Sequence, residues 1–149
     1  MASTSDIRNI VLLGHGGAGK TSLAEAVLHK TGATNRLGSV DDGTSTCDYH
    51  DEEKARQHSI TSAVVHTTHA GTAINIIDTP GYPDFLGTAI KAIPAAETAL
   101  IVISAAAGIE TNTRKLFELA AKANIPRLIV VNKIDAENID LPQLLKDIR

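Results

Sequence analysis

Residues 14–21, GHGGAGKT, have the composition of a phosphate-binding loop. Gly14 is followed by four residues and then by Gly19, Lys20 and Thr21, which fits the pattern G-x-x-x-x-G-K-[ST]. Glycines let successive backbone N–H groups point at one anion, and the start of a following helix adds its positive end. In this pattern the lysine neutralises the outer phosphates and the hydroxyl binds Mg²⁺. The predicted phosphate-binding residues are Gly14, His15, Gly16, Gly17, Ala18, Gly19, Lys20, Thr21 and Ser22.

The alternative for this loop is a glycine-rich turn that carries a surface lysine. The flanking segments favour a phosphate loop, because residues 7–13 are apolar and β-branched and residues 21–32 are rich in Ala and Leu and end at a glycine. A strand before the loop and a helix after it are the context that the motif requires. The pattern arises by chance in roughly one chain in two hundred of this length.

A second polar turn, DTPG, follows the apolar segment 73–78. An acid such as Asp78 at the end of a buried strand can hold a water molecule on Mg²⁺. Gly81 has no side chain, so its N–H group can approach a γ-phosphate. Taken alone, the four residues could equally be an ordinary turn. Beside a phosphate loop, we predict that Asp78, Thr79 and Pro80 contact the nucleotide and that Gly81 takes part in the chemistry.

A third polar turn, NKID, follows residues 127–132. The Asp135 carboxylate can accept hydrogen bonds from two N–H groups on one edge of guanine, and adenine offers neither donor there. The aliphatic stem of Lys133 can lie along the base plane. An ordinary polar turn is the alternative. Three such turns at the carboxyl ends of three predicted parallel strands favour a shared ligand site, so we predict that Asn132, Lys133 and Asp135 bind guanine.

The elements that must position these turns predict an α/β fold with a mostly parallel sheet covered by helices on both faces. Nearly continuous β-branched runs are typical of strands that are buried on both faces, and a fifth run is more polar and suits a sheet edge. The predicted buried strands are residues 7–13, 73–78, 98–104 and 127–132, and the predicted edge strand is 60–68. The predicted helices are 21–32, 111–124, a short helix from near Asp84 to Pro94, and one that includes Pro142.

Residues 33–59 have little periodicity and many turn-forming residues. We expect a long loop with one helical turn at residues 51–56, whose charged side chains form a solvated face. Loops of this length inside a compact domain are usually functional. The chain stops within its last predicted helix, so we expect it to be the first part of a longer domain that occupies residues 1–149 here.

The composition excludes several classes of protein. A length of 149 residues is about one domain, and a net charge of −3 does not favour DNA or a membrane surface as a partner. Cys47 is the only cysteine, which excludes an internal disulfide, favours a reducing compartment and predicts an inert thiol. No apolar run approaches the roughly 18 residues that span a bilayer, and the start lacks a secretory signal, so we expect a cytoplasmic protein.

In this order, GHGGAGKT, DTPG and NKID resemble the GTPases of the translation-factor group, and DEEKARQHSIT followed by DTPGYPDF is similar to elongation factor G and its paralogues. The resemblance covers essentially the whole chain as the first part of a G domain. The last guanine motif of the family, a Ser-Ala pair, has no counterpart after Asp135. The resemblance implies a P-loop NTPase fold, GTP or GDP and Mg²⁺ as cofactors, GTP hydrolysis, and the ribosome as partner.

The resemblance also implies roles for two positions in the long loop. Ser59 occupies the place of a threonine that closes over Mg²⁺ and the γ-phosphate, so the implied metal-binding residues are Thr21, Ser59 and Asp78. Residues 33–59 would then order around GTP and release after hydrolysis. The alternative for Ser59 is a solvated loop hydroxyl.

Four positions around the γ-phosphate depart from the family pattern, which suggests a divergent paralogue of elongation factor G. Tyr82 stands where the family has a histidine that orients the attacking water, Gly17 replaces an aspartate, and Gly16 and His58 replace apolar residues. One hypothesis is that His58 supplies part of the missing function, which makes Tyr82, Gly81 and His58 the candidate catalytic residues. The alternative is that His58 is an exposed loop residue and hydrolysis is slow.

Two other functions compete with a GTPase. The first is a GTP-dependent conformational switch with little or no hydrolysis. The second is an ATPase or small-molecule kinase, which the NKID turn disfavours because it predicts guanine.

Overall fold

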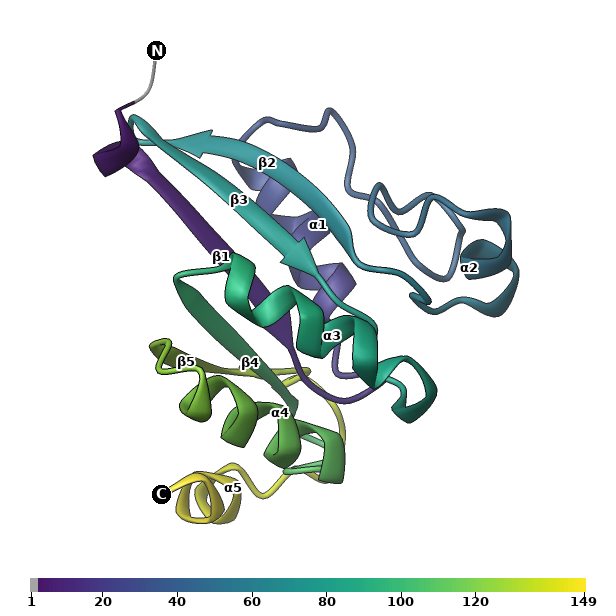
Figure 1. Cartoon of the computed structure of the whole chain (residues 1–149). Coiled ribbons are helices and arrows are strands. Elements are labelled where there is room, and N and C mark those ends of the chain that lie inside the picture. The colour runs from purple at the N-terminus through teal and green to yellow at the C-terminus, as the bar shows by residue number, and fades with distance from the viewer. Residues whose placement is uncertain (1–2) are drawn as a thin grey trace.

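A five-stranded sheet forms the centre of the computed structural model, which describes residues 3–149 of the predicted domain (Figure 1). Residues 1–2 lie outside the described part. The strands are β1 (Ile7–Leu13), β2 (Ala63–His69), β3 (Thr72–Asp78), β4 (Thr98–Ser104) and β5 (Arg127–Asn132). Their order is β2-β3-β1-β4-β5, and every pair is parallel except the antiparallel pair β2–β3. The prediction of a mostly parallel sheet with an edge strand is confirmed.

Helices cover both faces of this sheet, as predicted. The helices are α1 (Lys20–Lys30), α2 (Asp51–Arg56), α3 (Leu86–Ala92), α4 (Thr111–Lys122) and α5 (Leu141–Ile148), with short 3-10 turns at Thr4–Asp6, Pro83–Phe85 and Ile93–Ala95. Helix α1 lies behind the sheet in Figure 1, while α3 and α4 lie in front of it. None of the helices in residues 3–149 is long and apolar enough to cross a membrane.

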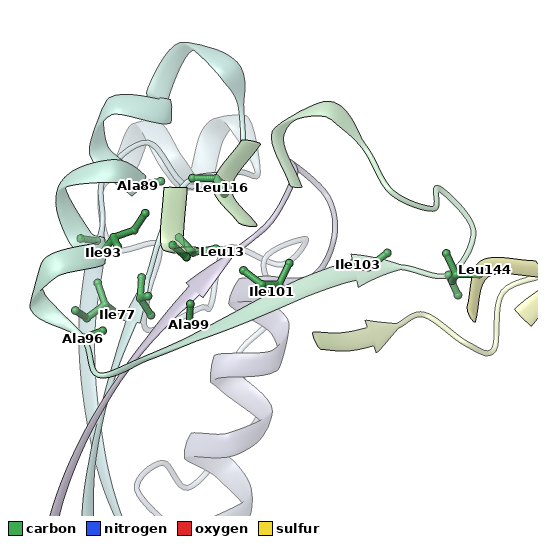
Figure 2. Close-up of a cluster of buried hydrophobic side chains, with 14 residues drawn as sticks. Leu13, Ile77, Ala89, Ile93, Ala96, Ala99, Ile101, Ile103, Leu116 and Leu144 are labelled. Carbon is green, nitrogen blue, oxygen red and sulfur yellow. The ribbon is translucent and has the colours of Figure 1, made fainter. Parts of the chain in front are cut away.

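The core consists of two hydrophobic clusters, one on each face of the sheet. Successive side chains of a strand point to opposite faces, so Val11 and Leu13 join one cluster and Leu12 joins the other. Figure 2 shows the first cluster, in which Leu116 of α4 packs near Leu13. The second cluster buries Leu28 of α1 against β1, β2 and β3. This alternation explains why the central strands are apolar along almost their whole length.

A tight hairpin joins β2 to β3. Ala70 and Gly71 form its two-residue turn with φ angles of 48° and 79°. Positive φ at both central positions is typical of the type I′ turn, whose twist matches that of the flanking strands. The resulting register pairs Ala63 with Asp78. The end of the long loop is therefore brought beside the carboxyl end of β3.

The long loop between α1 and β2 is held by Glu25, a fully buried residue of α1. The Glu25 carboxylate accepts hydrogen bonds from the Ser45 hydroxyl at 2.9 Å and from the backbone N–H groups of Thr46 and Cys47 at 2.5 and 3.1 Å. A buried carboxylate is stable only when such donors surround it. The first half of the loop is thus fixed to the helix that follows the phosphate loop.

The second half of the loop is organised around Glu53, and here one prediction is wrong. The helical turn at residues 51–56 is confirmed as α2, but Glu53 does not belong to a solvated face: it is 1% exposed. Its carboxylate accepts from the N–H groups of Ile60 and Thr61 at 2.9 and 3.0 Å. Because these N–H groups are used here, β2 begins at Ala63 rather than at the predicted residue 60.

Candidate functional site

A cavity lies at the carboxyl end of the sheet, where the phosphate loop, the long loop and the DTPG turn meet. These three segments lie side by side there, and Lys133 of the NKID turn lies at the same rim. The lining residues are Gly16, Gly17, Gly19, Lys20, Thr21, Ser22, Val40, Asp41, Asp48, Gln57, His58, Ser59, Gly81, Tyr82 and Lys133. This is the edge at which open α/β sheets bind ligands.

The phosphate loop wraps around the Lys20 side chain, which is 5% exposed. Its ammonium group donates hydrogen bonds to the carbonyl oxygens of Gly14 and His15 at 3.2 and 2.9 Å. Burial lowers the pKa of Lys20, and the nearby Asp78 carboxylate opposes that shift. Gly19 precedes α1 with a φ of 92°, in the left-handed region that glycine adopts without strain. The first turn of α1 therefore faces the cavity, and the Lys20 ammonium group lies inside the phosphate loop.

Two hydroxyls and two carboxylates form a polar cluster next to Lys20. The Thr21 hydroxyl donates to Asp78 Oδ2 at 2.6 Å and lies 3.1 Å from the Ser59 hydroxyl, which donates to Asp48 Oδ1 at 2.6 Å. The other oxygens, Asp78 Oδ1 and Asp48 Oδ2, are buried and have no hydrogen-bond partner within residues 3–149. Buried oxygens left unpaired are rare in proteins and point to an ion or water.

The electrostatics of this cluster suit a hard cation. Burial raises the pKa of Asp78 to about 6, against the opposing effects of the Thr21 hydrogen bond and the Lys20 charge. Burial also raises the pKa of Asp48, against the hydrogen bond from Ser59. A divalent cation would favour the ionised form of both groups, and oxygen ligands are those that Mg²⁺ prefers. The donor set therefore fits Mg²⁺ together with its water molecules, although residues 3–149 contain no group of three or more His, Cys, Asp or Glu side chains placed to hold a metal.

Asp48 was missed by the sequence analysis. It lies in the aperiodic part of the long loop, where nothing in the spacing distinguishes it from Asp41, Asp42 or Asp51. Only the folding of the loop around Glu25 and Glu53 brings it to the cavity. Cys47, its neighbour, is buried, and burial raises its thiol pKa, which agrees with the predicted inert thiol.

The DTPG turn is held against the phosphate loop. The Thr79 hydroxyl donates to the Leu12 carbonyl oxygen at 2.6 Å, which fixes the turn to β1. A Cβ atom added at Gly81 would collide with Lys20 Nζ and with the His15 carbonyl group. Glycine is therefore required here by close approach of two chain segments.

Tyr82 lies against both His58 and Gly16 in the wall of the cavity. The rings of His58 and Tyr82 have centroids 4.6 Å apart and are tilted by 50°. A Cβ atom added at Gly16 would lie 3.0 Å from the Tyr82 ring, so the glycine leaves space for the tyrosine. His58 Nδ1 is 2.9 Å from the Arg56 carbonyl oxygen. Because a carbonyl oxygen only accepts, this contact places a hydrogen on Nδ1, which makes Nε2 an acceptor in the neutral form of the ring.

The NKID turn contributes to the site in part. Asn132 donates from its side-chain amide to the Ala18 carbonyl oxygen at 3.0 Å, which ties β5 to the phosphate loop. Lys133 lines the cavity, whereas Asp135 is exposed and is not one of the lining residues. The predicted guanine-binding role of Asp135 stays a prediction.

Comparisons with known proteins agree with this geometry. Residues 5–149 match the family described as the elongation factor Tu GTP binding domain, and the chain belongs to this family. It is 40% identical to the tetracycline resistance protein TetS of Listeria monocytogenes over 143 residues, which are 96% of this chain and 22% of that protein. It is also 40% identical to an elongation factor G-like protein of Mycobacterium tuberculosis over 129 residues, covering 87% of this chain and 18% of that one.

Solved structures show the same fold. A crystal structure of a protein from Thermus thermophilus superposes with a TM-score of 0.93 at 40% identity, over 97% of this chain and 22% of that chain. The bacterial selenocysteine-specific elongation factor EF-Sec gives a TM-score of 0.73 at 26% identity, over 94% and 22% of the two chains. The predicted resemblance to elongation factor G and the P-loop GTPase fold are confirmed. The chain spans about a fifth of the length of the relatives it matches.

Proposed function

We propose that this chain binds GTP with Mg²⁺ and hydrolyses it to GDP and phosphate, as the N-terminal portion of the G domain of a cytoplasmic elongation factor G-like protein that acts on the ribosome. The observation that carries the proposal is the polar cluster of Thr21, Ser59, Asp48 and Asp78 beside Lys20. Membership of the elongation factor Tu GTP binding domain family supports the choice of nucleotide.

Each segment around the cavity has its own role in binding the nucleotide. The phosphate loop, residues 14–22, surrounds the phosphates with backbone N–H groups, and Lys20 exchanges its two carbonyl partners for phosphate oxygens. Thr21 and Ser59 would hold Mg²⁺ through their hydroxyl groups, and Asp78 and Asp48 would accept hydrogen bonds from its water molecules. The ion would neutralise charge on the outer phosphates. Gly81 allows the DTPG turn to approach the γ-phosphate. Asp135 and Lys133 bind the base.

Hydrolysis requires that a water molecule be held in line with the γ-phosphate. In the neutral form of the ring, His58 Nε2 is the acceptor for one hydrogen of that water, since Nδ1 is engaged with the Arg56 carbonyl. The Tyr82 ring supports the imidazole by stacking, and Gly16 makes room for it. The bond between the γ-phosphorus and the bridging oxygen breaks as the water oxygen bonds to phosphorus, and the water proton leaves with the phosphate.

Calorimetric titration with GTP, GDP and ATP, each with Mg²⁺, tests the binding step. GTP and GDP should bind while ATP should bind at least about a hundredfold more weakly, because adenine leaves the Asp135 carboxylate unpaired. Equal binding of ATP would contradict the guanine assignment. Asp135→Ala should weaken GTP binding, while the same change at Asp147, an acid of α5, serves as the matched control.

A second candidate function is a GTP-dependent switch that scarcely hydrolyses GTP. The observation in its favour is Tyr82, because a phenol is no base at neutral pH. Single-turnover assays with and without ribosomes separate the two functions. A switch would associate with ribosomes in the presence of GTP but release no phosphate.

A further inference from the structure

The start of helix α4 holds two loops of the cavity at once. The side-chain amide of Asn112 donates a hydrogen bond to the Gly81 carbonyl oxygen at 2.9 Å. The next residue, Thr113, accepts a hydrogen bond from the His15 backbone N–H at its hydroxyl oxygen, at 3.2 Å. Just before the helix, Glu110 lies 3.3 Å from the His15 imidazole. None of these three side chains was singled out by the sequence motifs.

The hydrogen bond from Asn112 to the Gly81 carbonyl oxygen is buried. Asn112 is 6% exposed and Thr113 is 2% exposed, so neither can exchange its protein partner for bulk water without opening the helix from the loops. A buried carbonyl group that loses its donor costs on the order of 1–3 kcal/mol. The Gly81 carbonyl is therefore strongly restrained toward α4.

Restraining this carbonyl fixes the path of the chain after the DTPG turn. Gly81 has no Cβ, so its own backbone torsions are the least restricted of any residue type. The orientation of its carbonyl sets the direction in which the chain leaves for Tyr82. Tyr82 in turn places its ring over Gly16 and against His58. The Asn112 amide thus determines, through one peptide group, where the stack of Tyr82 and His58 sits.

We propose that Asn112 is a positioning residue for the γ-phosphate end of the site: it holds the Gly81 peptide so that Tyr82 and His58 stack above the phosphate loop. Thr113 holds the other wall of the same space through His15. Helix α4 thereby sets the separation between the phosphate loop and the DTPG turn. The nucleotide part of this inference rests on the proposed function, whereas the position of the Tyr82 ring does not.

Tyrosine fluorescence tests the structural part without any nucleotide. The chain contains two tyrosines and no tryptophan, so Tyr49→Phe leaves Tyr82 as the only strong fluorophore. In this background Asn112→Ala should increase the quenching of Tyr82 by acrylamide, because Tyr82, which is 40% exposed in the parent, leaves its place over Gly16 and becomes more exposed. Unchanged quenching in a folded variant would overturn the proposal. If the alanine variant does not fold, Asn112→Ser gives the same comparison. The serine side chain is too short to reach the Gly81 carbonyl oxygen, so the hydrogen bond from the Asn112 amide is lost in this variant too.

Nucleotide affinity tests the functional part. Asn112→Ala should weaken binding of a non-hydrolysable GTP analogue about tenfold, as expected for one lost buried hydrogen bond, and leave GDP binding within about twofold. Thr113→Val is the matched variant: it removes the acceptor of the His15 N–H and should weaken both nucleotides without changing Tyr82 quenching. Equal losses of the GTP analogue and GDP in Asn112→Ala would overturn the positioning role. If the parent binds neither nucleotide, the proposed function fails while the quenching result still decides the role of Asn112.

Discussion

The hydroxyl groups of Thr21 and Ser59 lie 3.1 Å apart, although the two residues are 38 positions apart in the sequence. One hydroxyl belongs to the first turn of α1 and the other to the end of the long loop. Each also donates to a buried carboxylate, Asp78 for Thr21 and Asp48 for Ser59. A single cation at this point would bind both segments and so couple the loop to the nucleotide.

Replacing Ser59 by alanine should therefore weaken the Mg²⁺ dependence of nucleotide binding. We expect Ser59→Ala to bind a GTP analogue with Mg²⁺ about tenfold more weakly, and to bind it with EDTA as the parent does, because one metal-binding hydroxyl is lost. Calorimetry with Mg²⁺ and with EDTA measures both values. Ser5→Ala, the same change at an exposed serine, is the control. A Mg²⁺ dependence in Ser59→Ala as large as that of the parent would exclude Ser59 as a ligand.

Removal of the His58 imidazole should slow GTP hydrolysis without changing the affinity for GDP. We expect His58→Ala to reduce the single-turnover rate about tenfold or more, because a positioned acceptor for the water is lost. Tyr82→Phe keeps the stacked ring and should retain more activity than His58→Ala. His69→Ala, at the exposed end of β2, controls for loss of a histidine. Full activity of His58→Ala would favour the alternative that His58 is only a loop residue.

Glu25 should be important for stability and for the order of the long loop. In Glu25→Ala the Oε1 atom that accepts from both the Thr46 and the Cys47 N–H groups is lost. We expect a loss of about 1–3 kcal/mol in the free energy of unfolding. Thermal denaturation measures that loss, and hydrogen exchange at Thr46 and Cys47 should accelerate. The same substitution at the exposed Glu118 of α4 should change neither quantity.

Glu53 should make stability fall at acidic pH. Burial raises the pKa of Glu53, but hydrogen bonds from the N–H groups of Thr61, Ile60 and His50 outweigh it and lower the pKa below 4.5. The folded state then binds fewer protons than the unfolded state just below pH 4.5, so the stabilisation is complete above that pH and is lost as pH falls through the folded-state value. Denaturant unfolding between about pH 3 and 6 should show this loss. Glu53→Gln should be less stable at neutral pH. Its free energy of unfolding should also lack this contribution to the dependence on pH.

Most of the fold could be predicted from the sequence because local patterns agree with the final packing. The central strands are apolar on both faces, and α1 and α4 follow the predicted helices to within two residues at each end. The phosphate loop and the DTPG turn carry glycines at positions where the backbone allows nothing larger, as at Gly81. These features depend on neighbours along the chain or on one sheet, which a pattern can report.

The rest of the site depends on contacts between residues far apart in sequence. Glu53 reads as one more charge in a charged helix, and only its hydrogen bonds to Ile60 and Thr61 show why it is buried. Asp48 reaches the cavity because the loop on either side of it is fixed by Glu25 and Glu53. Asn112 lies in a segment that reads as an ordinary amphipathic helix. No spacing rule connects such residues to their partners.

The two-residue turn at Ala70 and Gly71 fixes the register of β2 against β3, and this register reaches the candidate site at the opposite end of the hairpin. Seven-residue strands carry its register over about 20 Å, to the pairing of Ala63 with Asp78. A shift of that pairing by one residue would turn every β2 side chain to the other face of the sheet. Ser59 would then lie away from Asp78, and the proposed cation would lose the long loop as a ligand. A turn at the far end of the hairpin therefore controls the position of one residue of the proposed metal site.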